Sequence, residues 1–402
     1  MTGRRGAPLL IVATLVLGAC GSARPTTAPT TTPAPTTTSS VAPATTSSVA
    51  PATTSPATTP TPATTSAPNP CAVARQPSPP SRVAAAFPTA LAFAPDGRLF
   101  FAERSGTVRV VQDGAPRLFA TVPTVTTEAG GGYSERGLLG LAVSPTFAAD
   151  RFVYAFYSAA NRSTQVVVRW TDCAGEGRDP KTIVELPAGG DCCHKGGRLA
   201  FGPDGKLYVT LGEEHSANAA ADTSDVRGKV LRYNPDGSVP ADNPFGNPVW
   251  ASGFRNPFGI AFSASGQLAV TSNGPTGDAG SPSTGYDLVA THVSRGSTYQ
   301  WPSCYGYSHP LRGGSCAGAE PEWSSEARAV VPTGATFVSP AGPAPYAGRL
   351  VFCTLNDGMK VLVDGSPHAT VTQGDDRCTL DVKQGPDNAL YVADTDAIYR
   401  LG

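Results

Sequence analysis

A histidine and two glutamates enclose one apolar hairpin in the middle of the chain. His194 opens the run HKGGRLAFGPDGKLYVTLGEE, and Glu213 and Glu214 close it. A histidine beside a carboxylate on an adjoining strand can act as a general base with an orienting partner. The alternative is a histidine that only hydrogen-bonds a loop, and the spacing alone favours neither.

An arginine precedes the next hairpin in the run WASGFRNPFGIAF, which places Arg255 and Asn256 side by side. An arginine at the mouth of a channel can bind a carboxylate or stabilise a developing oxyanion. The alternative is a structural salt bridge, which the local pattern by itself favours.

The turn Asn273-Gly274-Pro275 ends that hairpin, and Asp278 and Asp287 follow it. A tight Gly-Pro turn can direct main-chain carbonyls into an arc that suits a hard cation such as Ca²⁺. The alternative is an acidic loop that is only solvated.

These residues flank copies of one repeated phrase, in which two apolar strands enclose a turn rich in Pro, Asp and Gly. Asp-Gly after Pro is a hairpin signal, because Gly accepts a positive φ and Pro fixes its own φ. Six copies at blade-like spacing predict an all-β fold, a six-bladed β-propeller, over residues 71–402. The alternative is a β-sandwich with chance hairpins. The copies lie at 91–103, 141–157, 199–212, 260–274, 335–355 and 380–396.

Composition agrees with a β fold and excludes one class of partner. The 402 residues include 44 Gly and 39 Pro, which weaken helix interiors. The charged residues, 30 Lys+Arg against 31 Asp+Glu, give a net charge of −1. That balance argues against a nucleic-acid-binding protein of the generally basic kind.

The first seventy residues indicate export and anchoring. Residues 1–19 have two arginines and a short apolar stretch, which is typical of a secretory signal peptide. The stretch ends in Leu-Gly-Ala-Cys, which resembles a bacterial lipobox and predicts lipidation of Cys20. The alternative is an ordinary signal with an incidental cysteine. Residues 20–70 are almost entirely Thr, Pro, Ala and Ser, which predicts a disordered tether. We therefore expect an extracytoplasmic domain anchored to the cell membrane through lipid alone.

Eight further cysteines suit an oxidising compartment and allow four disulfides. We expect Cys304 to pair with Cys316 and Cys353 with Cys378. Cys71, Cys173, Cys192 and Cys193 would share two further bonds of undetermined connectivity. The absence of a CxxC pair argues against a zinc site.

Several motifs, taken together and in this order, make the chain similar to the soluble glucose/sorbosone dehydrogenase family. They are GLLGLAVSPTF, the His194 run quoted above, GKVLRYNPDGSVPADNPF, FRNPFGIAF, NGP and STYQWP. The resemblance spans most of 85–400 and implies a six-bladed propeller. Enzymatic members of this family use pyrroloquinoline quinone (PQQ) and Ca²⁺ to oxidise aldoses at C1.

The resemblance implies a role for each matching position. His194 matches the catalytic base and Glu213 the carboxylate that orients it, where the family usually has Asp. Arg255, also a catalytic candidate, and Asn256 match the pair that contacts the quinone oxygens. The remaining matches are Gly274 and Pro275 for the Ca²⁺ held with the cofactor, Asp287 and Tyr299 for a second Ca²⁺, Thr333 for the cofactor and Glu135 for the substrate.

The chain departs from the family where cations should hold the carboxylates of PQQ. Asn356 stands where the resemblance expects Lys, and Cys378 and Leu380 where it expects Arg. Arg377 is adjacent, but an offset of one residue in a strand points to the other face. Lys360 would substitute only if its hairpin shifts.

Two functions follow from these matches and departures. The first is a membrane-anchored extracytoplasmic sugar dehydrogenase that transfers hydride from C1 of an aldose to PQQ, with Ca²⁺. The second is a catalytically silent propeller that binds a cell-wall glycan or a protein, as in relatives of the Hedgehog-interacting type. The sequence names neither the sugar nor the electron acceptor.

Overall fold

The computed structural model of the chain describes residues 71, 73–189, 192–365 and 367–402. The predicted signal peptide (1–19), the predicted lipidation site Cys20 and the predicted tether (20–70) lie outside these residues and stay predictions. None of the helices in the described ranges is long and apolar enough to cross a bilayer.

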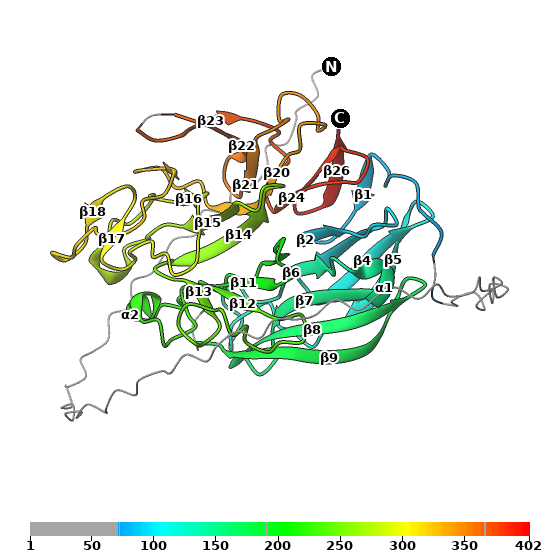
Figure 1. Ribbon diagram of the computed structural model, residues 1–402, viewed down its shortest axis with the longest axis horizontal. Coiled ribbons are helices and arrows are strands. Elements are labelled where there is room, and N and C mark those ends of the chain that lie inside the picture. Colours follow the sequence, from blue (N-terminus) through cyan, green and yellow to red (C-terminus); the bar gives the residue numbers. More distant parts are fainter. Residues whose placement is uncertain (1–70, 72, 190–191, 366) are drawn as a thin grey trace, which may run out of the picture. The chain divides into compact units, whose positions relative to one another are not determined.

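Six four-stranded antiparallel sheets form a six-bladed β-propeller, which confirms the predicted fold. Figure 1 shows the sheets following one another round a ring in the order of the sequence. The first strands of neighbouring blades contact each other, so these strands line the axis. From the axis outward, the first three blades consist of β2 (Pro88–Phe93), β3 (Leu99–Glu103), β4 (Thr107–Gln112) and β5 (Ala115–Thr121); β6 (Leu138–Val143), β7 (Phe152–Ser158), β8 (Thr164–Cys173) and β9 (Glu176–Pro187); and β10 (Leu199–Phe201), β11 (Leu207–Leu211), β12 (Lys229–Tyr233) and β13 (Val249–Ala251).

The other three blades follow the same plan, with small additions. Blades four to six consist of β14 (Asn256–Phe262), β15 (Leu268–Asn273), β16 (Leu288–Ala290) and β19 (Trp323–Ser324); β20 (Pro332–Phe337), β21 (Leu350–Thr354), β22 (Gly358–Val363) and β23 (Thr370–Gln373); and β24 (Asp381–Gln384), β25 (Leu390–Ala393), β26 (Ala397–Leu401) and β1 (Arg82–Ala84). The additions are a hairpin of β17 (Cys304–Tyr305) and β18 (His309–Pro310), and the short helices α1 (Phe147–Asp150), α2 (Ala217–Ala221) and η1 (Asp278–Gly280).

Each repeated phrase in the sequence forms the first two strands of one blade. In the first and third copies the turn glycines, Gly97 and Gly205, have φ of +92° and +70°. A side chain is strained at such angles, which explains the Asp-Gly signal. Glycine also recurs on the axis, for a different reason. A Cβ at Gly140 would lie 2.0 Å from the carbonyl oxygen of Gly197 on the next blade, so the axis has no room for it.

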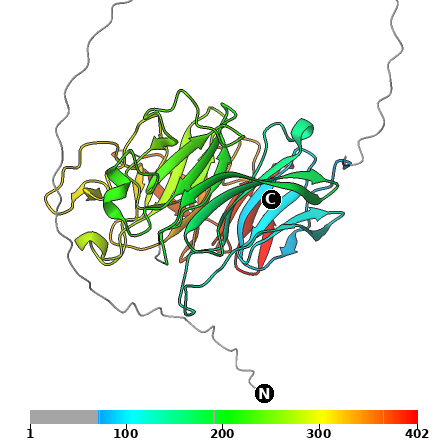
Figure 2. The same cartoon turned by 90° about the horizontal axis from the view of Figure 1, so that it is seen from below.

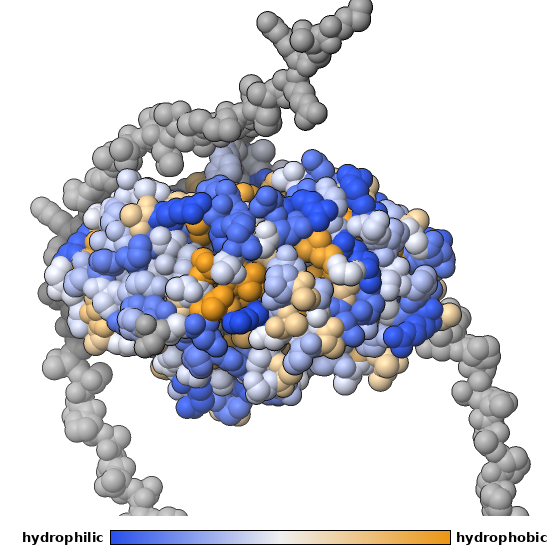
Figure 3. All heavy atoms as spheres, turned by 90° about the horizontal axis from the view of Figure 1, so that it is seen from above, coloured by the Kyte–Doolittle hydropathy of each residue, from blue (hydrophilic) through white to orange (hydrophobic). Residues whose placement is uncertain are grey.

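The core lies between the blades. Side chains of a strand alternate between two faces, and each face packs on a different neighbouring blade. Phe100, for example, packs with β7 and β8 of the second blade, whereas Phe101 packs with β25 and β26 of the last. Six such hydrophobic layers, one for each blade interface, bury most large apolar side chains. The face in Figure 3 is accordingly mostly hydrophilic, with small hydrophobic groups between polar ones.

The ring is closed by a strand from the other end of the domain. β1 pairs with β26 as the outermost strand of the last blade, with Arg82 opposite Tyr399. Disulfides reinforce the ring and confirm the predicted bonds Cys304–Cys316 and Cys353–Cys378. The connectivity left open by the sequence is Cys71–Cys173 and Cys192–Cys193.

Candidate active site

One end of the propeller gathers the predicted site residues. Many of them occupy two kinds of position, just before the first strand of a blade or just after its second strand. Because every blade runs the same way, both kinds of position lie at the same end of the ring. Glu135, His194 and Arg255 precede β6, β10 and β14, while Glu213 and Gly274 follow β11 and β15.

His194 and Glu213 form a buried pair, as the resemblance implies. Nδ1 of His194 lies 2.5 Å from Oε1 of Glu213, and the two residues are 4% and 0% exposed. Glu213 accepts a hydrogen bond from the Nδ1–H of His194. In this tautomer Nε2 carries a free lone pair. Nε2 has no hydrogen-bond partner among the described residues. His215, which the sequence reasoning did not single out, packs edge-on against His194 at 4.1 Å between ring centroids.

The burial of this pair shifts both pKa values toward the neutral forms. Burial lowers the pKa of His194 well below its ordinary range, and the charge of Arg255 lowers it further. Burial raises the pKa of Glu213 to about 7, against an opposing effect of Arg255. The imidazole is therefore neutral near pH 7, as a general base must be.

Arg255 is held by an acidic residue. Its Nε and Nη2 atoms donate to Asp278 at 2.7 and 2.9 Å, and Nη1 donates to the carbonyl oxygen of Gly274 at 2.5 Å. Burial would raise the pKa of Asp278, but these bonds and the charge of Arg255 outweigh it and hold that pKa well below its usual range. Arg255, the predicted quinone contact, is thus ion-paired with Asp278. It also donates to the turn that carries the predicted Ca²⁺ ligand Gly274. Oxygen and nitrogen atoms of His194, Glu213 and Asp278 lie within 4.8 Å of one another.

Asn256 and Glu135 connect the blades around His194. Asn256 donates from Nδ2 to Glu135 Oε2 at 3.2 Å and to Asn273 Oδ1 at 3.1 Å. Glu135 Oε2 also accepts the main-chain N–H of His194 at 2.8 Å. The loop that carries the histidine is therefore fixed from two neighbouring blades.

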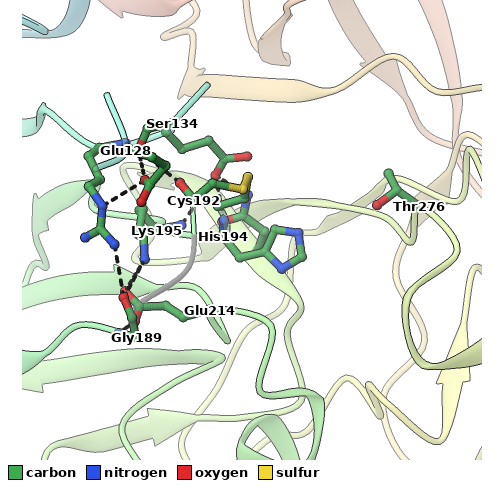
Figure 4. Close-up of a disulfide and its surroundings, with 12 residues drawn as sticks. Glu128, Ser134, Gly189, Cys192, His194, Lys195, Glu214 and Thr276 are labelled. Carbon is green, nitrogen blue, oxygen red and sulfur yellow. Dashed lines mark hydrogen bonds and ion pairs between the residues drawn. A yellow bond between two sulfur atoms is a disulfide. The ribbon is translucent and has the colours of Figure 1, made fainter. Parts of the chain in front are cut away.

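The loop behind His194 holds an ionic group that sequence reasoning missed. Lys195 Nζ lies 3.3 Å from Glu214 Oε1, both fully buried, and Arg136 Nε lies 3.1 Å from Glu128. Figure 4 shows this group on one side of the loop and the His194 ring on the side that faces Thr276. The neighbouring Cys192–Cys193 disulfide is anchored by its Cys192 carbonyl, which accepts the N–H of Glu135 at 2.9 Å. The acidic pair Glu213-Glu214 was the sequence signal for this ionic group. Glu213 contacts His194, whereas Glu214 contacts Lys195 on the other side of the loop.

The other predicted ligands lie around the Gly274 turn. Asp287 accepts main-chain N–H groups of Gly274, Val330 and Val331, each at 2.8 to 2.9 Å. Tyr299 stacks on Phe254 at 4.8 Å and, with Gly274 and Pro275, lines a narrow hollow.

A cavity of about 310 Å³ occupies the axis at this end, lined by residues of all six blades. Glu135 and Thr333, the predicted substrate and cofactor contacts, both line it, as does Asn273. Most of the remaining wall is apolar. It is formed by Phe87, Leu139, Phe258, Val331, Leu355 and Leu380.

Three positions lack the cation that the resemblance implies, and none of them places a positive charge in this cavity. Leu380 forms part of the apolar wall, Cys378 is buried in its disulfide and Asn356 is exposed. Lys360 and Arg377, the two cations close to these positions in the sequence, pair with other carboxylates. Lys360 Nζ lies 2.5 Å from Asp357, and Arg377 pairs with Asp375 at 2.6 Å.

Comparison with known proteins identifies the family. The glucose/sorbosone dehydrogenase family profile matches residues 85–400. The chain belongs to this family of PQQ-dependent sugar dehydrogenases. It is similar to quinoprotein glucose dehydrogenase B of Acinetobacter calcoaceticus, with 31% identity over 55% of this chain and 51% of that protein. It is also similar to an aldose sugar dehydrogenase of Escherichia coli, with 29% identity over 76% of this chain and 86% of that protein.

A solved structure adds the fold of a ligand-bound relative. The PQQ-bound aldose sugar dehydrogenase of Streptomyces coelicolor is 25% identical and superposes with a TM-score of 0.63. The match covers 80% of this chain and 99% of that one. Against the Acinetobacter protein, by contrast, the match spans about half of the relative's length.

The described residues of the axial cavity fit a planar quinone. The cavity has apolar walls for a flat ring system, and Arg104 and Asn273 are among the polar residues that line it. Ca²⁺ at the Gly274 carbonyl would have to replace Arg255 Nη1, which now donates to that oxygen.

Proposed function

We propose that this chain is a PQQ- and Ca²⁺-dependent dehydrogenase that oxidises an aldose at C1, anchored outside the cytoplasm through Cys20. The observation that carries the proposal is the buried His194–Glu213 pair. It lies beside an axial cavity and is connected to that cavity through Glu135. Membership of the family supports the reaction class.

The pair supplies the base. Glu213 holds the Nδ1 proton of His194, so the lone pair on Nε2 can accept the proton of a hydroxyl group. PQQ, when bound, supplies the two-electron acceptor for the hydride that leaves C1. The proton of the C1 hydroxyl then resides on Nε2, and the resulting imidazolium is stabilised by the carboxylate of Glu213.

Asn256, Thr333 and Arg255 are the residues that would hold the quinone, and the carbonyls of Gly274 and Pro275 would hold Ca²⁺. Arg255 brings a positive charge that is already balanced by Asp278, so it acts as a rigid hydrogen-bond donor more than as a net charge. Low exposure at His194, Arg255 and Asn256 excludes water from the base.

Calorimetric titration of the full chain with PQQ in excess Ca²⁺ tests the proposal. Saturable binding, followed by reduction of a dye acceptor with one or more aldoses, is the expected result. Undetectable binding would overturn the proposal. It would favour the silent propeller, for which the loss of cations at Asn356, Cys378 and Leu380 is the specific observation. Binding screens with cell-wall glycans and surface proteins would then follow.

A further inference from the structure

Arg104 is a cation of the axial cavity that has no acidic partner among the described residues. It directly follows β3 of the first blade and lines the cavity wall. Its Nε donates to the Arg136 carbonyl at 3.0 Å, and its Nη2 donates to the carbonyls of Thr126 and Ser134. No described carboxylate lies within ion-pairing distance of this guanidinium, and Nη1 has no hydrogen-bond partner in the same part of the chain.

The contrast with Arg198 singles Arg104 out. Arg198 also lines the cavity, but it is buried and pairs with Asp381 at 3.2 Å, and it donates to the Leu380 carbonyl. Its charge is therefore neutralised inside the protein. The carbonyls around Arg104 fix the side chain, and no carboxylate among the described residues forms an ion pair with it. Burial lowers the pKa of Arg104 and the charge of Glu135 opposes that effect; an arginine side chain keeps its proton at neutral pH.

The rim of the same cavity is unusually apolar for a water-exposed surface. Five large hydrophobic side chains are strongly exposed in the described chain, and two of them line this cavity: Tyr133, 72% exposed, and Leu355, 44% exposed. Exposed apolar groups that converge on a hollow with one unpaired cation match a ligand with a flat apolar body and an anionic edge.

We infer that Arg104 binds a carboxylate of the quinone cofactor, in place of the cations missing at Asn356, Cys378 and Leu380. This inference rests on the proposed function. The cationic contact thereby moves from the last two blades, five and six, to the first blade. The guanidinium can take this role through the two N–H groups of Nη1, because its other N–H groups donate to three carbonyls that already fix its position.

Fluorescence titration of the full chain with PQQ in excess Ca²⁺ tests the inference with three variants. Arg104→Gln removes the charge, and Arg104→Lys keeps it without the planar fork. Arg117→Gln is the control, because Arg117 lies on β5 of the same blade and pairs with exposed Asp113. We expect Arg104→Gln to weaken binding about 10- to 100-fold, as for the loss of a hydrogen bond to a charged group. Arg104→Lys should give an intermediate loss and Arg117→Gln none.

The trimethyl ester of PQQ separates a direct contact from a structural effect. The ester lacks the anionic oxygens, so wild type and the Arg104 variants should bind it with equal affinity. Equal binding of PQQ acid by wild type and Arg104→Gln would overturn the inference but leave the proposed function standing. A loss that is the same for acid and ester would also overturn it. If Arg104→Gln does not fold, the ratio of acid to ester affinity in Arg104→Lys decides. Absence of PQQ binding by wild type would instead overturn the proposed function.

Discussion

His194 and Glu213 share one short hydrogen bond, 2.5 Å between Nδ1 and Oε1, while the second carboxylate oxygen of Glu213 is buried with no hydrogen-bond partner among the described residues. A carboxylate in this state is poorly solvated, which explains its raised pKa. The protein keeps an unfavourably buried acid beside its histidine. Such an arrangement destabilises the fold and prepares the base for proton transfer.

Replacing His194 with Gln should lower the rate at which bound cofactor is reduced by sugar by about 10²- to 10⁴-fold, because the proton acceptor is lost. Stopped-flow absorbance under single-turnover conditions measures that rate, and PQQ affinity should change little. His309→Gln is the matched control, since His309 also pairs with a glutamate, Glu326 at 2.8 Å, but on an exposed hairpin. Equal rates for wild type and His194→Gln would contradict the assigned base.

The reduction rate should fall at acidic pH, with a midpoint set by the pKa of Glu213. Only the ionised carboxylate holds the Nδ1 proton of His194, and its pKa is raised to about 7. The reduction rate should therefore rise with pH and level off above about pH 7. Glu213→Gln should be slower and lack this fall in a pH–rate profile between pH 5 and 9. If the rate of the variant still falls at the same acidic pH, another group is responsible for the pH dependence.

Glu213→Gln should also stabilise the folded protein at alkaline pH. The folded-state pKa of about 7 lies above the ordinary 4.5, so between these values the folded state binds more protons than the unfolded state. The contribution of Glu213 to stability is thus complete below pH 4.5 and is lost as the pH rises through 7. The Tm of the variant should exceed that of wild type at pH 8, and the gap should narrow at pH 5. A gap that widens at pH 5 would contradict the burial argument.

Two disulfides should differ sharply in their effect on stability. Cys71–Cys173 closes a separation of 102 residues, and its removal by paired Ser substitutions should cost about 4 to 5 kcal/mol by chain entropy. Cys192–Cys193 joins adjacent residues and restricts the unfolded chain little. Its paired Ser variant should unfold near the wild-type urea concentration but turn over more slowly, because the bond precedes His194. A large shift in the midpoint for the second variant would disprove this ranking.

The repeated hairpins predicted the fold because each forms the two inner strands of a blade. The closing strand β1 could not be predicted in the same way, since its three residues belong to no copy and pair with the far end of the chain. The outer strands, β13 and β19 for example, are short and carry little pattern of their own.

The site was predictable where it depends on a position beside a copy, as for His194 and Glu213. It was less predictable where loops converge. The local pattern favoured a salt bridge at Arg255, whereas the resemblance implies a contact with the quinone oxygens. Its pairing with Asp278 depends on how η1 folds back. Arg104 could not be predicted in this way, because a charged residue after a strand is common and its place in the cavity depends on how the six blades converge.

The bond between Cys71 and Cys173 has a mechanical consequence. Cys71 precedes β1 in the chain, and its partner ends β8 in the second blade. A pull on the chain from its N-terminal side therefore enters the propeller through a covalent crosslink into β8. The load bypasses β1, which would otherwise be peeled from β26 one hydrogen bond at a time. With the anchor proposed at Cys20, the domain would bear such tension without opening its ring.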